Sequence, residues 1–240
     1  MHRFVLTTLF MLAAACSAGA SSGTPVAASG GGATRDFSVS GFSAVVLGGS
    51  DDVDVRVGPG YSVRAEGDPK LLDQLDIRKD GDTLMIGRKP QTGFGWAADK
   101  GARIVVTLPR LAAASTAGSG SLMIDRVQGD RFDARASGSG DLAVASLGVK
   151  SLSVDLAGSG KVTLAGSAAT GKFSSAGSGD VAGKALRMSS VTINMVGSGT
   201  IDAVVNGPAD VTMLGSGDVR LTGGARCTTS KIGSGEVSCS

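Results

Sequence analysis

The chain has 240 residues, a formal net charge of +2, 38 glycines but only 6 prolines, and 4% aromatic residues. High glycine with low proline excludes a collagen-like or proline-rich disordered chain, and interspersed charges without a basic run argue against a nucleic-acid partner. With 42% hydrophobic residues, mostly small or branched, the sequence favours a narrow, layered β-structure over a wide globular core.

Residues 1–16 have the pattern of an export signal. Arg3 precedes an apolar run that ends at Ala15, and this run is shorter than the roughly 20 residues that a membrane span needs. The run closes as LAAAC (residues 12–16), which resembles the lipobox of bacterial lipoproteins, although its leucine stands one place further from the cysteine than usual. We predict that Cys16 is lipidated and anchors an outer-membrane or periplasmic lipoprotein. The alternative is ordinary cleavage after Ala20, which would give a soluble periplasmic or secreted protein.

The only histidine, His2, lies inside this signal. The mature chain therefore has no histidine base, no histidine metal ligand and no Ser-His-Asp triad, so we expect no catalytic residues, no cofactor and no enzyme activity. Residues 17–35 are rich in Ser, Gly and Ala and lack periodicity, which predicts a flexible tether; an ordinary disordered N-terminus is equally consistent.

Residues 36–110 are predicted to form a β-rich lead-in, the N-terminal cap of the domain. Apolar residues alternate with polar ones at 53–57 and 61–65, and further strands are expected at 84–86 and 104–108. A short helix is expected at residues 68–75, because Asp68 can cap it and a proline follows at the first helical position.

The loop at residues 87–102 holds Phe94 and the only tryptophan, Trp96. Exposed aromatic side chains in loops are candidate binding anchors, so both residues are predicted ligand-binding candidates. The alternative is that they cover the open N-terminal end of the repeat structure that follows.

From residue 111 to residue 240 the chain is periodic. The tripeptide Gly-Ser-Gly recurs at intervals of 18 to 20 residues, beginning at Gly118, Gly138, Gly158, Gly177, Gly197, Gly215 and Gly233. Apolar residues alternate on both sides of each tripeptide, which indicates a strand, a corner and a second strand. A fixed period of this size predicts an all-β fold, a parallel β-solenoid of about seven 18–20-residue coils. The general preference for right-handed crossovers predicts its handedness.

Each Gly-Ser-Gly has two possible roles. Its N–H groups could cradle an anion, or its glycines could form a tight corner between stacked coils, which the recurrence at every coil favours. The residue after the tripeptide is acidic at Asp141, Asp180, Asp218 and Glu236. These four are weak candidates for calcium ligands, because Lys161 interrupts their row and a hard cation needs six or more oxygens; solvated corner carboxylates are the favoured interpretation.

Cys227 and Cys239 lie six residues before and six residues after Gly233, in the inward register of the last coil. In an exported protein we predict a disulfide between them that closes the end of the solenoid; two buried free thiols are the alternative.

Several stretches resemble the family known as the putative auto-transporter adhesin, head GIN domain, a bacterial exported domain of unknown function. They are FSVSGFSAVV (37–46), VDVRVG (53–58), VRAEGDPKLLDQLDIRKDGDTLMI (63–86), IVVTLPRL (104–111) and the Gly-Ser-Gly array. The resemblance covers nearly all of residues 37–240 and implies a β-solenoid-like fold and an adhesin-like role. It brings no catalytic motif with it.

Three functions follow as hypotheses. The first is a non-enzymatic envelope lipoprotein of adhesin-like type, with the membrane as partner through its lipid and with an envelope protein or glycan as a possible ligand. The second is a structural spacer or scaffold in the envelope. The third is a β-solenoid enzyme acting on polysaccharide, which the short, even repeats disfavour because they leave no long loops to build a site.

Overall fold

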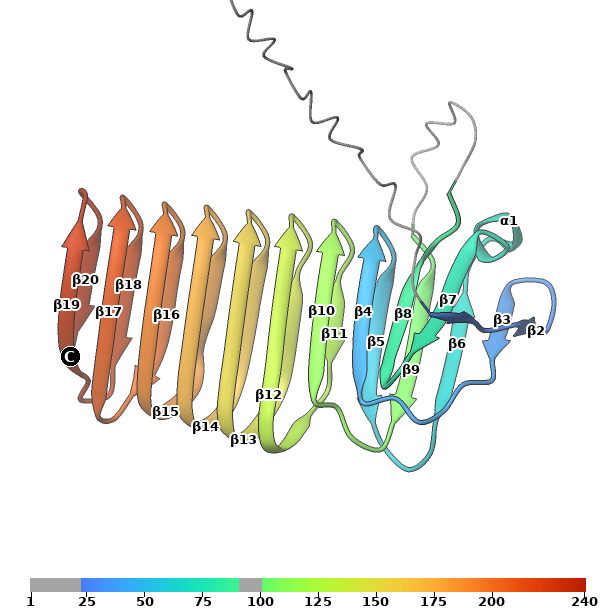
Figure 1. Cartoon of the computed structure of the whole chain (residues 1–240), viewed down its shortest axis with the longest axis horizontal. Coiled ribbons are helices and arrows are strands. Elements are labelled where there is room, and N and C mark those ends of the chain that lie inside the picture. The colour runs from blue at the N-terminus through green and yellow to red at the C-terminus, as the bar shows by residue number, and fades with distance from the viewer. Residues whose placement is uncertain (1–22, 91–100) are drawn as a thin grey trace, which may run out of the picture.

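The computed structural model describes residues 23–90 and 101–240. It is nearly all β-structure, with 70% strand and 2% helix, and forms a β-solenoid of about six turns. Strands that run up the front of the molecule return behind it and stack side by side along one axis (Figure 1). The predicted solenoid is therefore confirmed, and the expected number of about seven coils is close.

One coil runs from one Gly-Ser-Gly corner to the next. A strand of the front sheet enters each corner and a strand of the back sheet leaves it. The repeats contain β10 (Ala113–Gly118), β11 (Leu122–Ile124), β12 (Val127–Gly138), β13 (Leu142–Gly158), β14 (Lys161–Gly177), β15 (Asp180–Gly197), β16 (Thr200–Val205), β17 (Pro208–Gly215), β18 (Asp218–Thr222), β19 (Arg226–Ile232) and β20 (Glu236–Cys239). All pairings among them are parallel, and each corner glycine faces the matching glycine of the next coil, as Gly138 faces Gly158.

The core is a thin layer between the two sheets. Every second residue of each strand points inward, so that Leu122 and Ile124 of the back sheet are buried together with Phe132 and Ala134 of the front sheet. The inward rows are those that the alternation around each corner predicts. Small and branched side chains suffice because the sheets face each other closely along the whole stack.

Two further strand pairs extend this stack on its N-terminal side. β4 (Ala44–Gly49) and β5 (Asp52–Val57) pair directly with β10 and β11, and β8 (Thr83–Arg88) and β9 (Arg103–Leu108) pair with β4 and β5 from the other side. The predicted boundary at residues 110 and 111 is therefore not a break in the fold. The corner between β4 and β5 reads Gly49-Ser50-Asp51, because Gly49 pairs with Gly118. An aspartate therefore replaces the second glycine of the repeated tripeptide, so the sequence pattern did not reveal this coil.

A buried carboxylate joins the outermost coil to this first corner. Asp51 is fully buried, and its carboxylate accepts hydrogen bonds from Arg88 at 2.7 and 3.0 Å and from the backbone N–H of Ala102 at 2.8 Å. A bidentate arginine and a backbone donor together compensate the cost of burying the charge.

Antiparallel strands close the N-terminal end. β6 (Ser62–Glu66) pairs with β9, and β7 (Leu75–Asp80) pairs with β8. The helix α1 (Pro69–Leu72) lies between them with Asp68 as its N-cap, as predicted. β3 (Thr34–Phe37) pairs with β6, β2 (Ala28–Ser29) with β3, and β1 (Thr24–Pro25) with β7. These strands cover backbone groups that an open edge would expose.

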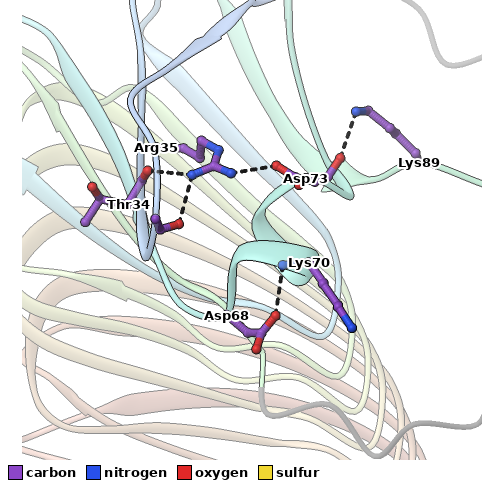
Figure 2. Close-up of polar contacts among 7 residues, drawn as sticks. Thr34, Arg35, Asp68, Lys70, Asp73 and Lys89 are labelled. Carbon is purple, nitrogen blue, oxygen red and sulfur yellow. Dashed lines mark hydrogen bonds and ion pairs between the residues drawn. The ribbon is translucent and has the colours of Figure 1, made fainter.

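Polar contacts hold the first described residues against this cap, as Figure 2 shows. The Arg35 guanidinium donates to the Asp73 carboxylate at 2.7 Å and to the carbonyls of Gly32 and Thr34. Lys89 donates to the Asp73 carbonyl at 2.8 Å. Arg35 is thus tied to Asp73 at the end of α1, and Asp73 in turn to the segment after β8.

The structure differs from the predicted tether over residues 23–35. The backbone N–H of Val26 donates to the Ile77 carbonyl at 2.8 Å, and the side chain of Val26 packs against the core. The Ser/Gly/Ala-rich composition predicted flexibility here. β1 and β2 have only two residues each, which is too few to show an alternating pattern in the sequence. The folded part therefore begins earlier than residue 36.

Candidate functional site

The Gly-Ser-Gly corners bring backbones into close contact. Gly158 has φ +125°, and a Cβ at Gly158 would lie closer than 3.0 Å to the carbonyl oxygen of Gly138. Gly160 meets the carbonyl of Gly140 in the same way. Both glycines are therefore required by the stacking of one corner on another.

The donors of these corners are already in use. The N–H groups of Ser159 and Gly160 both donate to the carbonyl oxygen of Gly138, at 2.9 and 3.1 Å, and corners before and after repeat this pattern. An anion cradle needs such N–H groups free to point at its ligand. The tripeptide is a structural corner, and the anion-cradle interpretation is wrong for the stacked corners.

The acids after the corners also bind the next coil. The Asp141 carboxylate accepts from the backbone N–H of Lys161 at 3.0 Å, Asp180 from that of Thr200 at 2.9 Å, and Asp218 from that of Glu236 at 3.3 Å. Within residues 23–90 and 101–240, no group of three or more potential metal ligands occurs. The structure thus shows Asp141, Asp180, Asp218 and Glu236 spread along one edge, and it gives three of them a hydrogen-bonding role.

Cys227 and Cys239 form the predicted disulfide, with 6.4 Å between their Cα atoms. They align with Ala209 and Leu221 of the preceding coil, both buried, which confirms the inward register. The other two kinds of predicted site, the lipidation site Cys16 and the aromatic pair Phe94 and Trp96, lie outside the described residues.

The back sheet carries a cleft of about 510 Å³ that spans β5, β11, β13 and β14. We call it the back-sheet cleft. Its lining comprises Asp54, Val55, Arg56, Arg103, Met123, Ile124, Asp125, Ala143, Val144, Ala145, Thr163 and Ala165. This volume lies within the range of about 300–1,000 Å³ that is common for small-molecule sites.

The cleft arises from a change of side-chain size along one outward-facing row. Asp54, Met123, Ala143 and Thr163 are neighbours in register on four consecutive strands. Met123 stands 57% exposed, whereas the next positions carry alanine or threonine. The row therefore steps down from large to small side chains and leaves a hollow with an apolar floor.

Charged side chains form the rim. Arg103 donates to the Asp54 carboxylate at 2.9 and 2.5 Å, and this hydrogen bond and the carboxylate charge raise the pKa of the Arg103 guanidinium. Asp125 accepts from the backbone N–H groups of Val57 and Arg126 at 2.9 and 2.6 Å. Both rim carboxylates are thus engaged by neighbours.

Arg56 differs from the other rim charges. It is exposed, and among the described residues no side-chain hydrogen bond or ion pair is found for it. The lining that the described residues provide contains one hydroxyl, that of Thr163, and no Ser, Cys or His. This set suits noncovalent binding of an apolar group with one charge contact better than nucleophilic catalysis.

The sequence contained one sign of this cleft that was not recognised. Outward positions of a solvated strand are usually polar, yet the stretches LAVA (142–145) and VTLA (162–165) place alanine at three of four such positions. Met123, in LMI (122–124), is likewise apolar and outward-facing. Only the register between distant strands shows that these residues adjoin Arg56.

Residues 41–225 match the family described as "Putative auto-transporter adhesin, head GIN domain". The chain belongs to this family. Head GIN domain membership confirms the resemblance seen in the sequence. No curated protein matches the chain. No helix among the described residues is long and apolar enough to cross a membrane.

Solved structures resemble this head GIN domain closely in fold. A putative adhesin from Bacteroides fragilis superimposes with a TM-score of 0.79 at 23% identity, over 86% of this chain and 95% of that chain. A putative lipid binding protein from Parabacteroides distasonis gives 0.69 at 23% identity, over 86% and 96%. A putative adhesin from Parabacteroides merdae gives 0.68 at 18% identity, over 86% and 95%. At these identities the likeness shows the fold alone.

Proposed function

We propose that the protein is a non-enzymatic binding protein of the bacterial cell envelope that holds its ligand in the back-sheet cleft. The observation that carries this proposal is the cleft itself, an apolar hollow of about 510 Å³ on an otherwise regular solenoid. Family membership supports it, because the family is described as an adhesin head. One structural neighbour is described as a lipid binding protein and others as adhesins, which favours binding over catalysis.

The binding test compares two variants of the mature chain. Ala143 lines the cleft, and Ala182 lies in the same outward row, two coils further on and outside the cleft. Both are partly exposed, so a tryptophan at either position should be tolerated by the fold. The wild type is first screened against envelope extracts, glycans, proteins and lipids. We expect A143W to lose the binding that the wild type shows, and A182W to retain that binding. If both variants bind as the wild type does, the cleft is not the binding site.

The proposal includes the cellular location of the protein. We propose that Cys16 is lipidated and anchors the mature chain to the membrane, on the basis of the lipobox-like LAAAC sequence and the export-signal pattern. Mass spectrometry of the native N-terminus should find a lipid-modified Cys16. A mature protein that starts at Ser21 would contradict the anchor and leave a soluble exported protein.

A polysaccharide-acting enzyme is the competing function. The two carboxylates on the cleft rim, Asp54 and Asp125, are held by Arg103 and by backbone N–H groups. Hydrogen bonds from neighbouring groups therefore already occupy both carboxylates. Incubation of the mature chain with acidic polysaccharides should give no reducing-end products; turnover that D54N or D125N removes would establish catalysis instead.

A further inference from the structure

We propose that the ligand of the back-sheet cleft is a single-chain amphiphile with an anionic headgroup. Its apolar chain lies on the floor formed by Met123, Ala143, Ala145 and Ala165, and its headgroup pairs with Arg56. This inference rests on the proposed function, because it names the ligand class of the same cleft.

The floor selects the apolar part of the ligand. Three alanines and the exposed Met123 side chain present methyl and thioether groups without hydrogen-bonding capacity. The floor crosses the strands from β11 to β14, so two strand spacings give it a length of roughly 10 Å along the stack. Among residues 23–90 and 101–240 no aromatic side chain lines the cleft, so this part of the chain offers a sugar ring no flat apolar surface to stack on. A flexible hydrocarbon chain fits this surface better than a glycan does.

The rim selects the charge. Asp54 is bound by Arg103, and Asp125 is bound by backbone N–H groups and lies 3.4 Å from the Arg126 guanidinium. Arg103 pairs with Asp54 and Arg126 with Asp125, whereas Arg56 has no such acidic partner among the described residues and presents an unpaired guanidinium at the rim. A guanidinium presents paired donors that match a carboxylate, phosphate or sulfate group. A cationic headgroup would gain nothing at this position.

The test uses the mature full chain and three probes below their micelle concentrations. Dodecanoate carries the chain and the anion, dodecyltrimethylammonium carries the chain with the opposite charge, and butanoate carries the anion with a short chain. We expect dodecanoate to shift the NMR signals of the Met123 and Ala143 methyl groups. The other two probes should require at least about tenfold higher concentration, as the loss of a charge-assisted hydrogen bond or of buried methylenes predicts.

Matched variants locate the two parts of the ligand. R56Q should weaken dodecanoate binding about tenfold, whereas R187Q, which removes another exposed arginine outside the cleft, should leave it unchanged. A143W should abolish binding while A182W does not. Circular dichroism and melting curves check that each variant is folded.

Each outcome decides a different point. Equal binding of the cationic and anionic probes, or equal effects of R56Q and R187Q, would overturn the headgroup assignment. An absence of dodecanoate binding would overturn the amphiphile. If A143W nevertheless abolished binding of an envelope protein or glycan, the proposed function would stand with a different ligand class.

Discussion

At the scale of single residues, the corner glycines are the most constrained positions of the fold. We predict that G158A lowers the free energy of unfolding by about 1–3 kcal/mol. Alanine at φ +125° is strained, and its Cβ would overlap the Gly138 carbonyl. The neighbouring S159A is the control, since the Ser159 side chain is exposed and contributes no hydrogen bond that stacking needs. Urea unfolding measures both. Equal stabilities would show that the stacked corners can move apart freely.

A second residue-scale prediction concerns an exposed ion pair. Lys150 lies 2.7 Å from Asp130, and its hydrogen bond and positive charge lower the pKa of the Asp130 carboxyl group. We predict that K150M raises the pKa of Asp130 toward the ordinary aspartate value, as an NMR titration of the carboxyl signal would measure. An unchanged pKa in K150M would mean that the pair does not form in solution.

The sign of the linked stability effect follows from the direction of the shift. Because the folded pKa of Asp130 is lowered, the pair stabilises the fold at neutral pH, and this contribution is lost as the pH falls through the folded pKa. Both side chains are mostly exposed, so the contribution is small and weakens further with added salt.

At the scale of elements, the last coil protects an open edge. β19 pairs with β17 on one side, and no described strand pairs with its other side. Thr229 and Lys231 occupy inward positions where β17 has Val211 and Met213, and Lys231 reaches the Gly235 carbonyl at 2.7 Å. Polar and charged inward residues are a known way to prevent one sheet edge from joining another.

This arrangement predicts the outcome of making the last coil apolar. The double variant T229V/K231V should associate end to end with rising concentration, because it restores the apolar inward row on an unpaired edge. The control T228V/S230V adds apolar side chains to the outward face of the same strand and should stay monomeric. Light scattering over a concentration series measures both. Monomeric T229V/K231V, or equal association of the two variants, would contradict the assigned role of Lys231.

Elements also show what could be predicted from sequence. The repeats after residue 111 were predictable because period, corner and alternation repeat together, and α1 was predictable because Asp68 and Pro69 form a local start signal. The coil of β4 and β5 was missed because its corner, Gly49-Ser50-Asp51, has an aspartate where the tripeptide has its second glycine. The placement of β8 and β9 outside β4 and β5 depends on long-range pairing, which no local pattern encodes.

The cleft was beyond sequence reasoning for a related reason. Its shape depends on the difference in size between the side chains of Met123 and Ala143. This difference matters only because the two residues are neighbours in register on adjacent strands of consecutive coils. Its charge depends on Arg103 binding Asp54, which leaves Arg56 without an acidic partner in the part of the chain that the structure describes. Alternation predicted which residues point outward, but the partners of an outward residue come from the stacking register.

At the scale of the whole molecule, the repeat architecture allows the binding and spacer functions to be separated. Stacked repeats contact mainly their neighbours, so removal of whole coils should leave a shorter but continuous stack. Deletion of residues 139–177 removes two coils, including Ala143, Ala145, Thr163 and Ala165, and joins Gly138 to Ser178. Deletion of residues 178–215 also removes two coils but leaves the cleft lining complete, and it joins Gly177 to Ser216. Both junctions restore the tripeptide Gly-Ser-Gly.

The two deletions shorten the solenoid by nearly the same length, so a spacer would respond to both in the same way. A protein that binds through the back-sheet cleft should lose its ligand only in the deletion of residues 139–177. In that variant Ala182 replaces Ala143 beside Met123, but the position after it in the row is Asp202, a charged residue that interrupts the apolar floor. Binding to the envelope ligand decides between the spacer and the cleft-binding function. A melting curve for each deletion checks that the variant is folded. Equal loss of binding would favour a function that depends on the length of the stack, and equal retention would place the binding site outside both deleted segments. Loss confined to the first deletion would place the function in the cleft.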